Sequence, residues 1–243
     1  MRIYLAGIAS HQSICEKNPP KYFLESFYYF KDWEKALLET SDILLDSGAF
    51  TFMQSSKKKT NWDEYIERYA QFIVSNNIDK FFELDIDSIV GYAEVLRLRD
   101  KLQRLTGKQP IPVWHKPRGI SEYKRHCDEF PYIAIGGYVI KEFRPSDFSA
   151  LPAMLNYAHL HNTKVHGLGF TATTRLKEYH FDSVDSTTWT VGGRFADLCY
   201  FDGHTMRRWS SVRNGMKMTN SEGVCEKNYN EWLKFQAYAE HHL

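Results

Sequence analysis

Short runs of apolar residues alternate along this chain with longer segments in which apolar residues recur every three or four positions. The short runs cover residues 3–5, 43–45, 81–84, 111–114, 132–135, 165–168, 181–184 and 198–201. Short apolar runs predict buried strands, and their alternation with helical segments is typical of parallel βα units. About eight such units favour an α/β fold of the (β/α)8 TIM-barrel type, although a doubly wound sheet would give a similar pattern.

The clearest helical segment covers residues 62–76, where Trp62, Tyr65, Ile66 and Tyr69 recur at i, i+3, i+4 and i+7 spacing. Asn61 is the predicted N-cap of this helix. Further helices are predicted at residues 92–105, 121–129, 147–161 and 228–241. Because no repeat or Pro/Gly/Ser-rich linker divides the chain, we expect one barrel domain over residues 1–243, with its last helix at about 228–241.

The composition and the cysteine spacing indicate where the protein is located and whether it binds a metal. With 43% hydrophobic and 25% charged residues, the chain has the composition of an ordinary globular protein. No apolar stretch approaches the roughly 18–20 residues of a membrane span, and no signal peptide is evident, so a cytoplasmic setting is expected. The four cysteines are widely separated, which favours reduced thiols over a metal site, and we expect neither metal nor other cofactor.

The net charge of +1 gives no bulk attraction to polyanions, so a nucleic-acid partner would have to be held by local basic patches. Arg207 and Arg208, with Arg194 and Arg213 nearby in the sequence, are the candidates for such contacts. Each of these arginines could equally belong to a solvated surface.

Aspartates stand where predicted strands end. Asp46 follows the second run and Asp85 the third, while Asp182 falls in the seventh run and Asp185 directly follows it. In parallel α/β proteins the strand ends converge on one mouth, where chemistry is usually found. Each Asp alone could be a turn or cap residue, but several at one end of a barrel favour a site. Paired carboxylates suit glycosidic chemistry, in which one stabilises an oxocarbenium-like centre and another handles a proton.

Glycine and histidine accompany these carboxylates. Gly136 and Gly137 end the fifth run and could let the backbone approach a flat ligand, or could form a plain turn. His115 ends the fourth run, and His166 with Gly167 lies in the sixth. For His115, a buried structural histidine is an alternative to a ligand contact.

The motifs in this order resemble those of the tRNA-guanine transglycosylases, which exchange guanine for a 7-deazaguanine such as queuine or its precursors. Residues 45–50, LDSGAF, resemble the family's D-S-G-G-[FY] motif. The segments that look like later family motifs are LDI at 84–86, AIGG at 134–137, HGLG at 166–169 and DSVDS at 182–186. The matching motifs run through residues 43–194.

The resemblance implies a (β/α)8 enzyme and a role for each matching residue. Asp182 would match the nucleophile that attacks C1′ of the sugar, and Asp46 the general acid or base for the exchanged base. Phe50 would match the aromatic ring that stacks on the base, and Asp85 the residue that recognises its Watson–Crick edge. Backbone contacts would come from Gly136 and Gly137. His166 with Gly167 would lie beneath the ring, and His115 would match a side-chain amide that touches the base.

The identity of the nucleophile depends on the alignment. Asp182 and Asp185 are three residues apart, so on a regular strand they face opposite sides and only one can point into the mouth. The preferred alignment assigns the nucleophile to Asp182. A slip of the alignment would assign it to Asp185.

The chain also departs from the family. It has no counterpart of the family's C-x-C-x-x-C zinc motif, is shorter than the tRNA enzymes, and has Gly48-Ala49 in place of Gly-Gly. These departures resemble the compact phage and bacterial relatives that act on DNA, which favours DNA over tRNA as the partner and a host cytoplasm if the chain is phage-encoded. The alternatives are a non-catalytic nucleic-acid-binding subunit and a nucleoside N-glycosidase or deoxyribosyltransferase. A homodimer or a partner subunit stays open.

Overall fold

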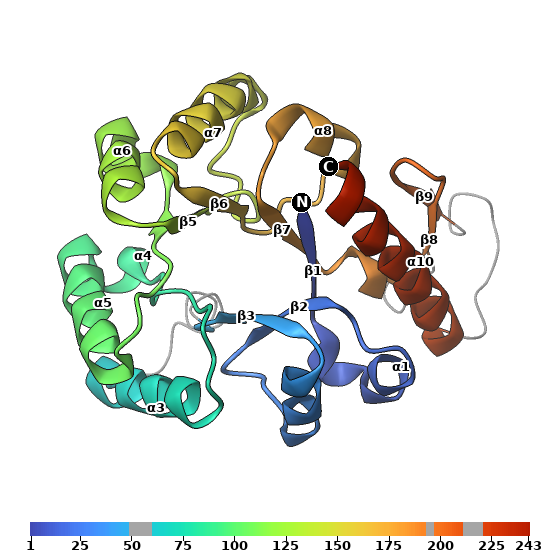
Figure 1. The fold of residues 1–243 in the computed structure, drawn as a ribbon, viewed down its shortest axis with the longest axis horizontal. Coiled ribbons are helices and arrows are strands. Elements are labelled where there is room, and N and C mark those ends of the chain that lie inside the picture. The colour runs from blue at the N-terminus through green and yellow to red at the C-terminus, as the bar shows by residue number, and fades with distance from the viewer. Residues whose placement is uncertain (49–59, 193–196, 211–220) are drawn as a thin grey trace.

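A ring of parallel strands surrounded by helices forms the centre of the molecule (Figure 1). The computed structural model describes residues 1–48, 60–192, 197–210 and 221–243. The strands are β1 (Arg2–Ala6), β2 (Tyr22–Ser26), β3 (Asp42–Asp46), β4 (Val113–Trp114), β5 (Tyr132–Ile135), β6 (Lys164–Gly167), β7 (Ser183–Ser186), β8 (Asp197–Phe201) and β9 (Met206–Ser210).

Helices follow most of the strands. The α-helices are α1 (Gln12–Lys17), α3 (Trp62–Ser75), α4 (Asp87–Val90), α5 (Tyr92–Thr106), α6 (Gly119–Glu129), α7 (Leu151–Leu160), α8 (Leu176–Tyr179) and α10 (Ser221–His242). Short 3-10 helices are η1 (Ile8–Ser10), η2 (Asp32–Glu39), η3 (Lys116–Arg118), η4 (Pro145–Ala150), η5 (Thr173–Arg175) and η6 (Thr188–Thr190). Asn61 caps α3 as predicted, since its side chain accepts a hydrogen bond from the Glu64 amide at 3.3 Å.

The parallel strands run in the order β3-β2-β1-β7-β6-β5-β4, so chain neighbours are sheet neighbours. Two isolated parallel bridges, Leu45 with Phe81 and Phe82 with Ile111, span the remaining gap between β3 and the segment leading into β4. The segment at Phe81 and Phe82 therefore takes the eighth position and closes the ring. This closure confirms the prediction of a (β/α)8 barrel.

One predicted strand lies outside the barrel, and one strand of the barrel was not predicted. The run at 198–201 lies in β8, which pairs antiparallel with β9 in a separate two-stranded sheet beside α10 (Figure 1). The strand that completes the barrel is instead β2, which was not predicted and lies between β1 and β3, while β1 pairs directly with β7. An apolar run does not reveal its pairing partner: Tyr200 of β8 is 48% exposed, whereas Tyr22 and Phe23 of β2 are buried.

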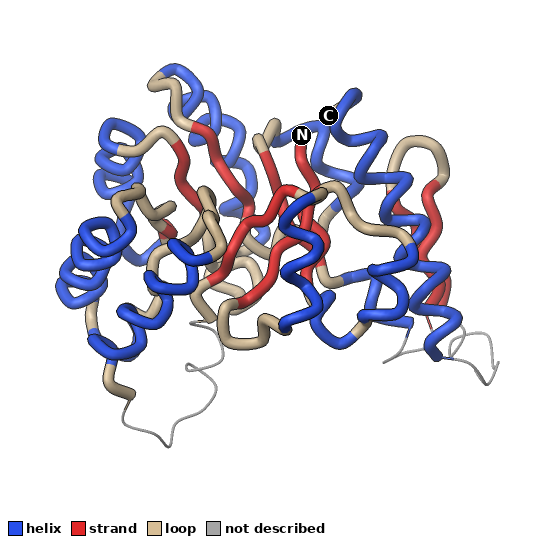
Figure 2. The backbone as a smooth tube through the Cα atoms, turned by 60° about the horizontal axis from the view of Figure 1, so that its bottom comes forward, coloured by secondary structure: helices blue, strands red, loops and turns tan. Residues whose placement is uncertain are grey.

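The alternation of side chains along each strand separates two apolar layers. Tyr4, Leu44 and Phe82 belong to a cluster inside the ring, whereas Ile3 and Leu45 pack in the larger core between the ring and the helices. Because strand residues alternate with a period of two, Asp46 lies on the same inner face of β3 as Leu44. Polar residues at the carboxyl ends of the strands therefore point into one mouth. Figure 2 shows both labelled termini on the opposite side of the molecule.

The buried side chain of Gln236 on the long helix α10 contacts the start of the barrel. Gln236 donates hydrogen bonds to the carbonyls of Ile3 (2.7 Å) and Tyr22 (2.8 Å) and accepts one from the Lys21 amide (2.9 Å). These contacts connect α10 with the backbones of β1 and β2.

We expect Gln236→Ala to lower the free energy of unfolding by about 2–4 kcal/mol, because it leaves buried backbone groups without partners. Urea denaturation followed by circular dichroism measures this change. Lys227→Ala, at an exposed position of the same helix, is the matched control and should have little effect. Equal stability of the two variants would contradict this role for Gln236.

Candidate functional site

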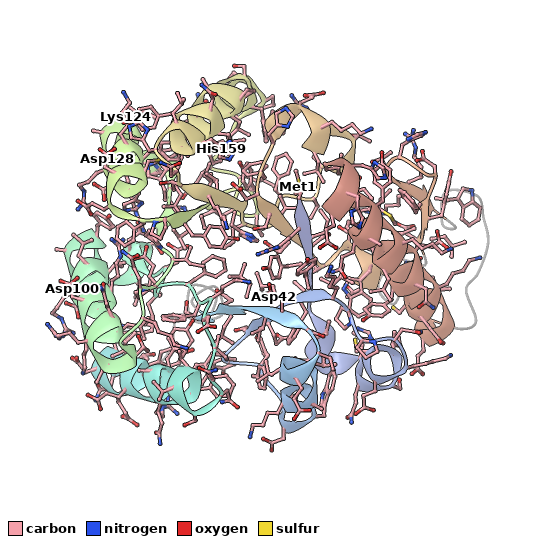
Figure 3. The ribbon with its side chains drawn as sticks, in the orientation of Figure 1. Met1, Asp42, Asp100, Lys124, Asp128 and His159 are labelled. Carbon is pink, nitrogen blue, oxygen red and sulfur yellow. The ribbon has the colours of Figure 1, made fainter. Side chains whose placement is uncertain are left out.

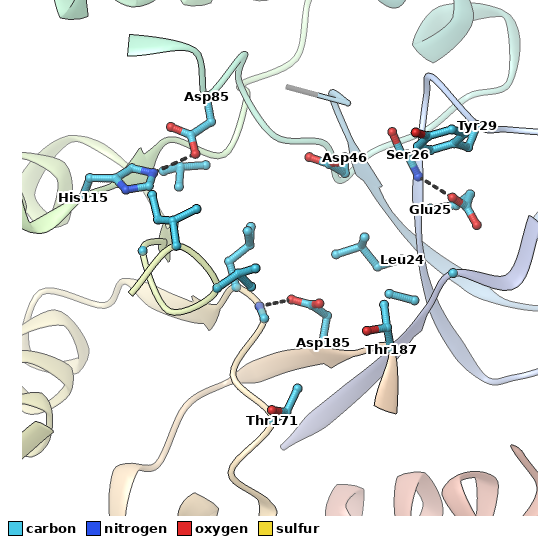
Figure 4. A pocket seen from close by; sticks show the side chains of 18 residues that line it. Leu24, Glu25, Ser26, Tyr29, Asp46, Asp85, His115, Thr171, Asp185 and Thr187 are labelled. Atoms are coloured by element: carbon cyan, nitrogen blue, oxygen red, sulfur yellow. Dashed lines mark hydrogen bonds and ion pairs between the residues drawn. The ribbon is translucent and has the colours of Figure 1, made fainter. Parts of the chain in front are cut away.

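A cavity of about 480 Å³ opens at the carboxyl ends of the strands (Figure 4). Loops after the strands and the last strand residues supply its walls, as in other parallel barrels. The cavity is lined by Ala6, Gly7, Leu24, Glu25, Ser26, Tyr29, Asp46, Asp85, Val113, His115, Gly137, Val139, Ile140, Leu168, Gly169, Thr171, Asp185 and Thr187. Three aspartates from β3, β7 and the loop after Phe82 thus share one space.

Asp46 is the last residue of β3, and its carboxylate accepts a hydrogen bond from the Gly48 amide at 3.2 Å. Burial, together with the negative charges of Asp85 and Asp185, raises the pKa of Asp46 to about 7. A carboxyl group with this pKa can give and take a proton near neutral pH, which general acid–base catalysis requires.

Asp85 is paired with a histidine that follows the neighbouring strand of the ring. Its Oδ2 lies 2.7 Å from Nε2 of His115 (Figure 4). Nδ1 of the same ring lies 2.8 Å from Oε2 of Glu142. Burial alone would lower the pKa of His115, but the hydrogen bonds and charges of Asp85 and Glu142 outweigh it and raise the pKa to about 10. A cationic His115 therefore stands between two carboxylates, where it fixes Asp85 and compensates its charge. Arg118 is a second cation, 3.4 Å from Oδ1 of Asp85.

Asp185 lies on β7 and faces the cavity. Its Oδ1 accepts a hydrogen bond from the Gly169 amide at 2.6 Å and lies 3.1 Å from Nε2 of His166. Its other oxygen, Oδ2, has no hydrogen-bond partner among the described residues, although Asp185 is only 8% exposed. The carboxylate is thus held at one oxygen while the other stays available to a ligand.

The expectation that Asp182 stands at the mouth is wrong. The structural strand begins one residue later, at Ser183, so Asp182 precedes β7 at the opposite end of the barrel. Its Oδ2 accepts from the Val165 amide at 2.8 Å and lies 3.0 Å from Nε2 of His159, and its carbonyl accepts from the Arg2 amide. His159 is labelled in Figure 3, which views the side where the strands begin. Asp185 takes the position at the mouth that the preferred alignment gave to Asp182.

The remaining predicted contacts divide between the cavity wall and the layer behind it. His115 and Gly137 line the cavity, and Gly137 has a φ of 92°, which favours glycine. Gly136, Gly167 and His166 are not among the residues that line it, so their contact with a base stays a prediction. A Cβ on Gly136 would lie 2.7 Å from His115, so this glycine makes room for the imidazole instead.

Other predicted residues lie away from the cavity or cannot be located. Phe50, Arg194 and Arg213 fall outside the described residues. Arg207 and Arg208 lie on β9 and pair with Asp202 and Asp197 of the same hairpin, with their side chains about half exposed. Neither lines the cavity, so a contact with nucleic acid stays a prediction. Within the described part of the chain, no helix is both long and apolar enough to cross a membrane.

The sequence analysis missed one wall of the cavity because it missed β2. Glu25 and Ser26 end this strand, and Tyr29 follows it. Glu25 contacts the buried Glu34, whose pKa is raised to about 8 by burial and by the charge of Glu25. The signal for β2 was the run Tyr22-Phe23-Leu24 after two prolines, which is short but rich in strand-forming residues.

The fold and the cavity together define a (β/α)8 barrel with an acidic site at the carboxyl ends of its strands. No protein-family profile and no curated protein sequence matches the chain. Among solved structures, it is similar to a proposed fructose-1,6-biphosphate aldolase from Coccidioides immitis, with a TM-score of 0.53 and 13% identity over 98% of this chain and 87% of that one.

It is also similar to the carboxyl transferase domain from Rhizobium etli pyruvate carboxylase, with a TM-score of 0.50 and 12% identity. That match covers 98% of this chain and 48% of the other. At these identities the likeness concerns the fold alone.

The raised pKa of Asp46 predicts a pH-dependent stability. Between about pH 4 and pH 7 the folded protein retains a proton that the unfolded chain has released, so this group makes stability fall as pH rises through that range. Asp46→Asn stays neutral, and its free energy of unfolding should therefore rise relative to wild type from pH 4 to pH 7.

Urea denaturation at pH 4.5, 6 and 7.5 tests this expectation. Asp128→Asn, which changes an exposed carboxyl group on α6, is the control and should follow wild type. A constant difference between Asp46→Asn and wild type across this range would show that Asp46 is ionised throughout.

Proposed function

We propose that this chain is a pentosyltransferase that replaces guanine in a nucleic acid by a 7-deazaguanine through a covalent intermediate on Asp185. The observation that carries the proposal is that Asp46, Asp85 and Asp185, from three motifs that resemble those of the guanine transglycosylases, line one cavity. A cavity of about 480 Å³ is large enough for a nucleoside unit.

In the first step, Oδ2 of Asp185 attacks C1′ of the target sugar. The bond between C1′ and N9 of guanine breaks, its electron pair goes to the base, and protonated Asp46 gives its proton to the departing guanine. The products are a sugar ester of Asp185, neutral guanine and ionised Asp46. Because the pKa of Asp46 is about 7, this carboxyl group can hold the required proton at neutral pH.

In the second step, the 7-deazaguanine occupies the place of the released guanine. Asp46 takes the proton from N9 of the incoming base, N9 attacks C1′, and the bond to Asp185 breaks with its electron pair on the carboxylate. The enzyme returns to its starting state, with Asp46 protonated and Asp185 ionised. The two displacements are balanced without an external acid, base or oxidant.

Asp85 is the proposed base-recognising residue. A carboxylate only accepts hydrogen bonds when ionised, which suits the N1–H and 2-amino donors of guanine and of 7-deazaguanines. Cationic His115 lies 2.7 Å from Oδ2 of Asp85 and orients this carboxyl group. His115 then acts on the base through Asp85, not in place of an amide.

DNA is the favoured polymer, because the sequence lacks the cysteine motif of the tRNA enzymes. Arg207 and Arg208 are candidates for contacts with phosphate groups of the bound nucleic acid. A nucleoside exchanger and a non-catalytic subunit are the competing functions, and the assay below separates them.

Asp185 on β7 and Asp182 directly before it form a matched pair for the test. Asp185→Asn should lower the incorporation of labelled 7-deazaguanine by about 10³-fold or more, because the nucleophile is lost. Asp182→Asn lies at the other end of the barrel and should retain activity within an order of magnitude.

The purified protein is incubated with labelled base and, in separate reactions, with DNA, tRNA or a free nucleoside. Labelling of DNA supports the proposal in full. Labelling of tRNA alone would show that tRNA, and not DNA, is the polymer substrate. Exchange confined to the nucleoside would favour the small-molecule function. Loss of activity in Asp182→Asn with retention in Asp185→Asn would overturn the assignment of the nucleophile.

A further inference from the structure

A line of buried polar side chains runs through the interior of the barrel behind Asp185. His166 is fully buried on β6, and its Nδ1 lies 2.6 Å from Oγ of Ser183. The same Oγ lies 2.5 Å from Oη of Tyr132 on β5. Together with the contact of 3.1 Å from Nε2 to Asp185, these distances form a chain across three adjacent strands.

Strand geometry explains why these residues meet. Ser183 and Asp185 are two residues apart on β7 and therefore face the same side. His166 is paired with Ser183 in the register of β6 and β7, so its ring lies between the two. Its neighbours inside the barrel are aromatic: the ring centroid of Phe82 lies at 5.5 Å and that of Tyr4 at 6.0 Å. In such apolar surroundings a polar ring needs partners at both nitrogens.

The carboxylate of Asp185 at one end determines the direction of these hydrogen bonds. Oδ1 of Asp185 already accepts from the Gly169 amide, and as an acceptor toward His166 too it requires Nε2 to carry the hydrogen of this bond. In the neutral ring Nδ1 is then an acceptor and receives the Ser183 hydroxyl, whose oxygen in turn receives the Tyr132 hydroxyl. All three donors thus point toward Asp185. A hydrogen bond at the second nitrogen determines the tautomer of a histidine.

We propose that His166 is a positioning residue for Asp185, and that Ser183 and Tyr132 hold it in the Nε2–H tautomer. The Nε2–H group and the Gly169 amide both bind Oδ1, which leaves Oδ2 as the oxygen that reacts. His166 does not line the cavity, so this role differs from the one expected from the resemblance. This inference rests on the proposed function only where Asp185 is called the nucleophile; the tautomer and the orientation of the carboxylate are independent of it.

Substitutions at His166 test the role by its effect on kcat and KM. His166→Leu should lower kcat by about 10²-fold, because a misplaced carboxylate costs reactivity and not affinity for the substrate. His166→Gln can place an amide donor near the position of Nε2 and should recover about tenfold of that loss. The control is His126→Leu, which removes an equally buried imidazole on α6 that takes no part in these hydrogen bonds.

Equal kcat in His166→Leu and His166→Gln, or a loss confined to KM, would overturn the proposal. If His166→Leu fails to fold, Ser183→Ala carries the kinetic test, since it removes only the donor to Nδ1. In that variant the ring is free to take the other tautomer, in which the Nε2 lone pair faces the carboxylate, so kcat should again fall. Unchanged kcat in a folded Ser183→Ala would contradict the role of the Ser183–His166 hydrogen bond in positioning Asp185.

A spectroscopic measurement separates this inference from the proposed function. In ¹⁵N-labelled wild-type protein, long-range ¹H–¹⁵N correlation should show His166 with a protonated Nε2 and an unprotonated Nδ1. Ser183→Ala should shift the Nδ1 resonance, whereas His126→Leu should leave it in place. If wild type exchanges no base yet shows this tautomer, the proposed function fails and the orientation of Asp185 stands. If Nδ1 carries the hydrogen instead, the positioning role fails whatever the enzyme's activity.

Discussion

Repulsion among carboxylates is the constraint on which this site depends. Asp46, Asp85 and Asp185 share one cavity, with Glu25 on a further wall, and charges in a partly buried space repel more strongly than in water. The structure reduces this electrostatic repulsion in a different way for each carboxyl group. Asp46 keeps its proton up to about pH 7, Asp85 is compensated by His115, and Asp185 is stabilised by hydrogen bonds from a backbone amide and an imidazole. The same differences suit the three roles proposed for these groups: a proton carrier, an acceptor for a base edge and a nucleophile.

The barrel makes this arrangement possible through its strand geometry. Closing the ring at Phe81 and Phe82 brings the ends of non-adjacent strands to one mouth, and side-chain alternation then selects which residues face inward. Asp46 on β3 and Asp185 on β7 meet for this reason. The layer below the mouth holds His166, Ser183 and Tyr132, so the interior of the barrel supports the site as well as the fold. The similarity to an aldolase and to a carboxyl transferase domain belongs to this shared architecture.

The sequence was sufficient for the barrel and for part of the site. The alternation of apolar runs and helices predicted the fold, and both Asp46 and Asp85 lie at the mouth because they directly follow apolar runs. It failed where the choice depended on a register. The run at 181–184 suggested a strand that begins before Asp182, whereas β7 begins at Ser183 and carries Asp185 to the mouth. A shift of this size decides which carboxylate can react, and it depends on pairing with β1 and β6, which a single sequence does not contain.

Long-range pairing also explains the other differences. β2 was missed, and with it Glu25, Ser26 and Tyr29, because its pairing with β1 and β3 is what makes it a barrel strand. His166 was expected beneath a base because its motif follows the order of the family, but its hydrogen bonds point to Asp185 and Ser183.

The central claim is that Asp185 forms the covalent bond to the sugar. It is tested most directly by incubating the wild-type protein with a guanine-containing DNA oligonucleotide and no incoming base, quenching with acid, and mapping any cross-linked peptide by mass spectrometry. The account predicts release of guanine and an oligonucleotide attached to Asp185. An adduct on Asp46 or on any other residue, or base exchange in which no adduct can be trapped, would contradict it.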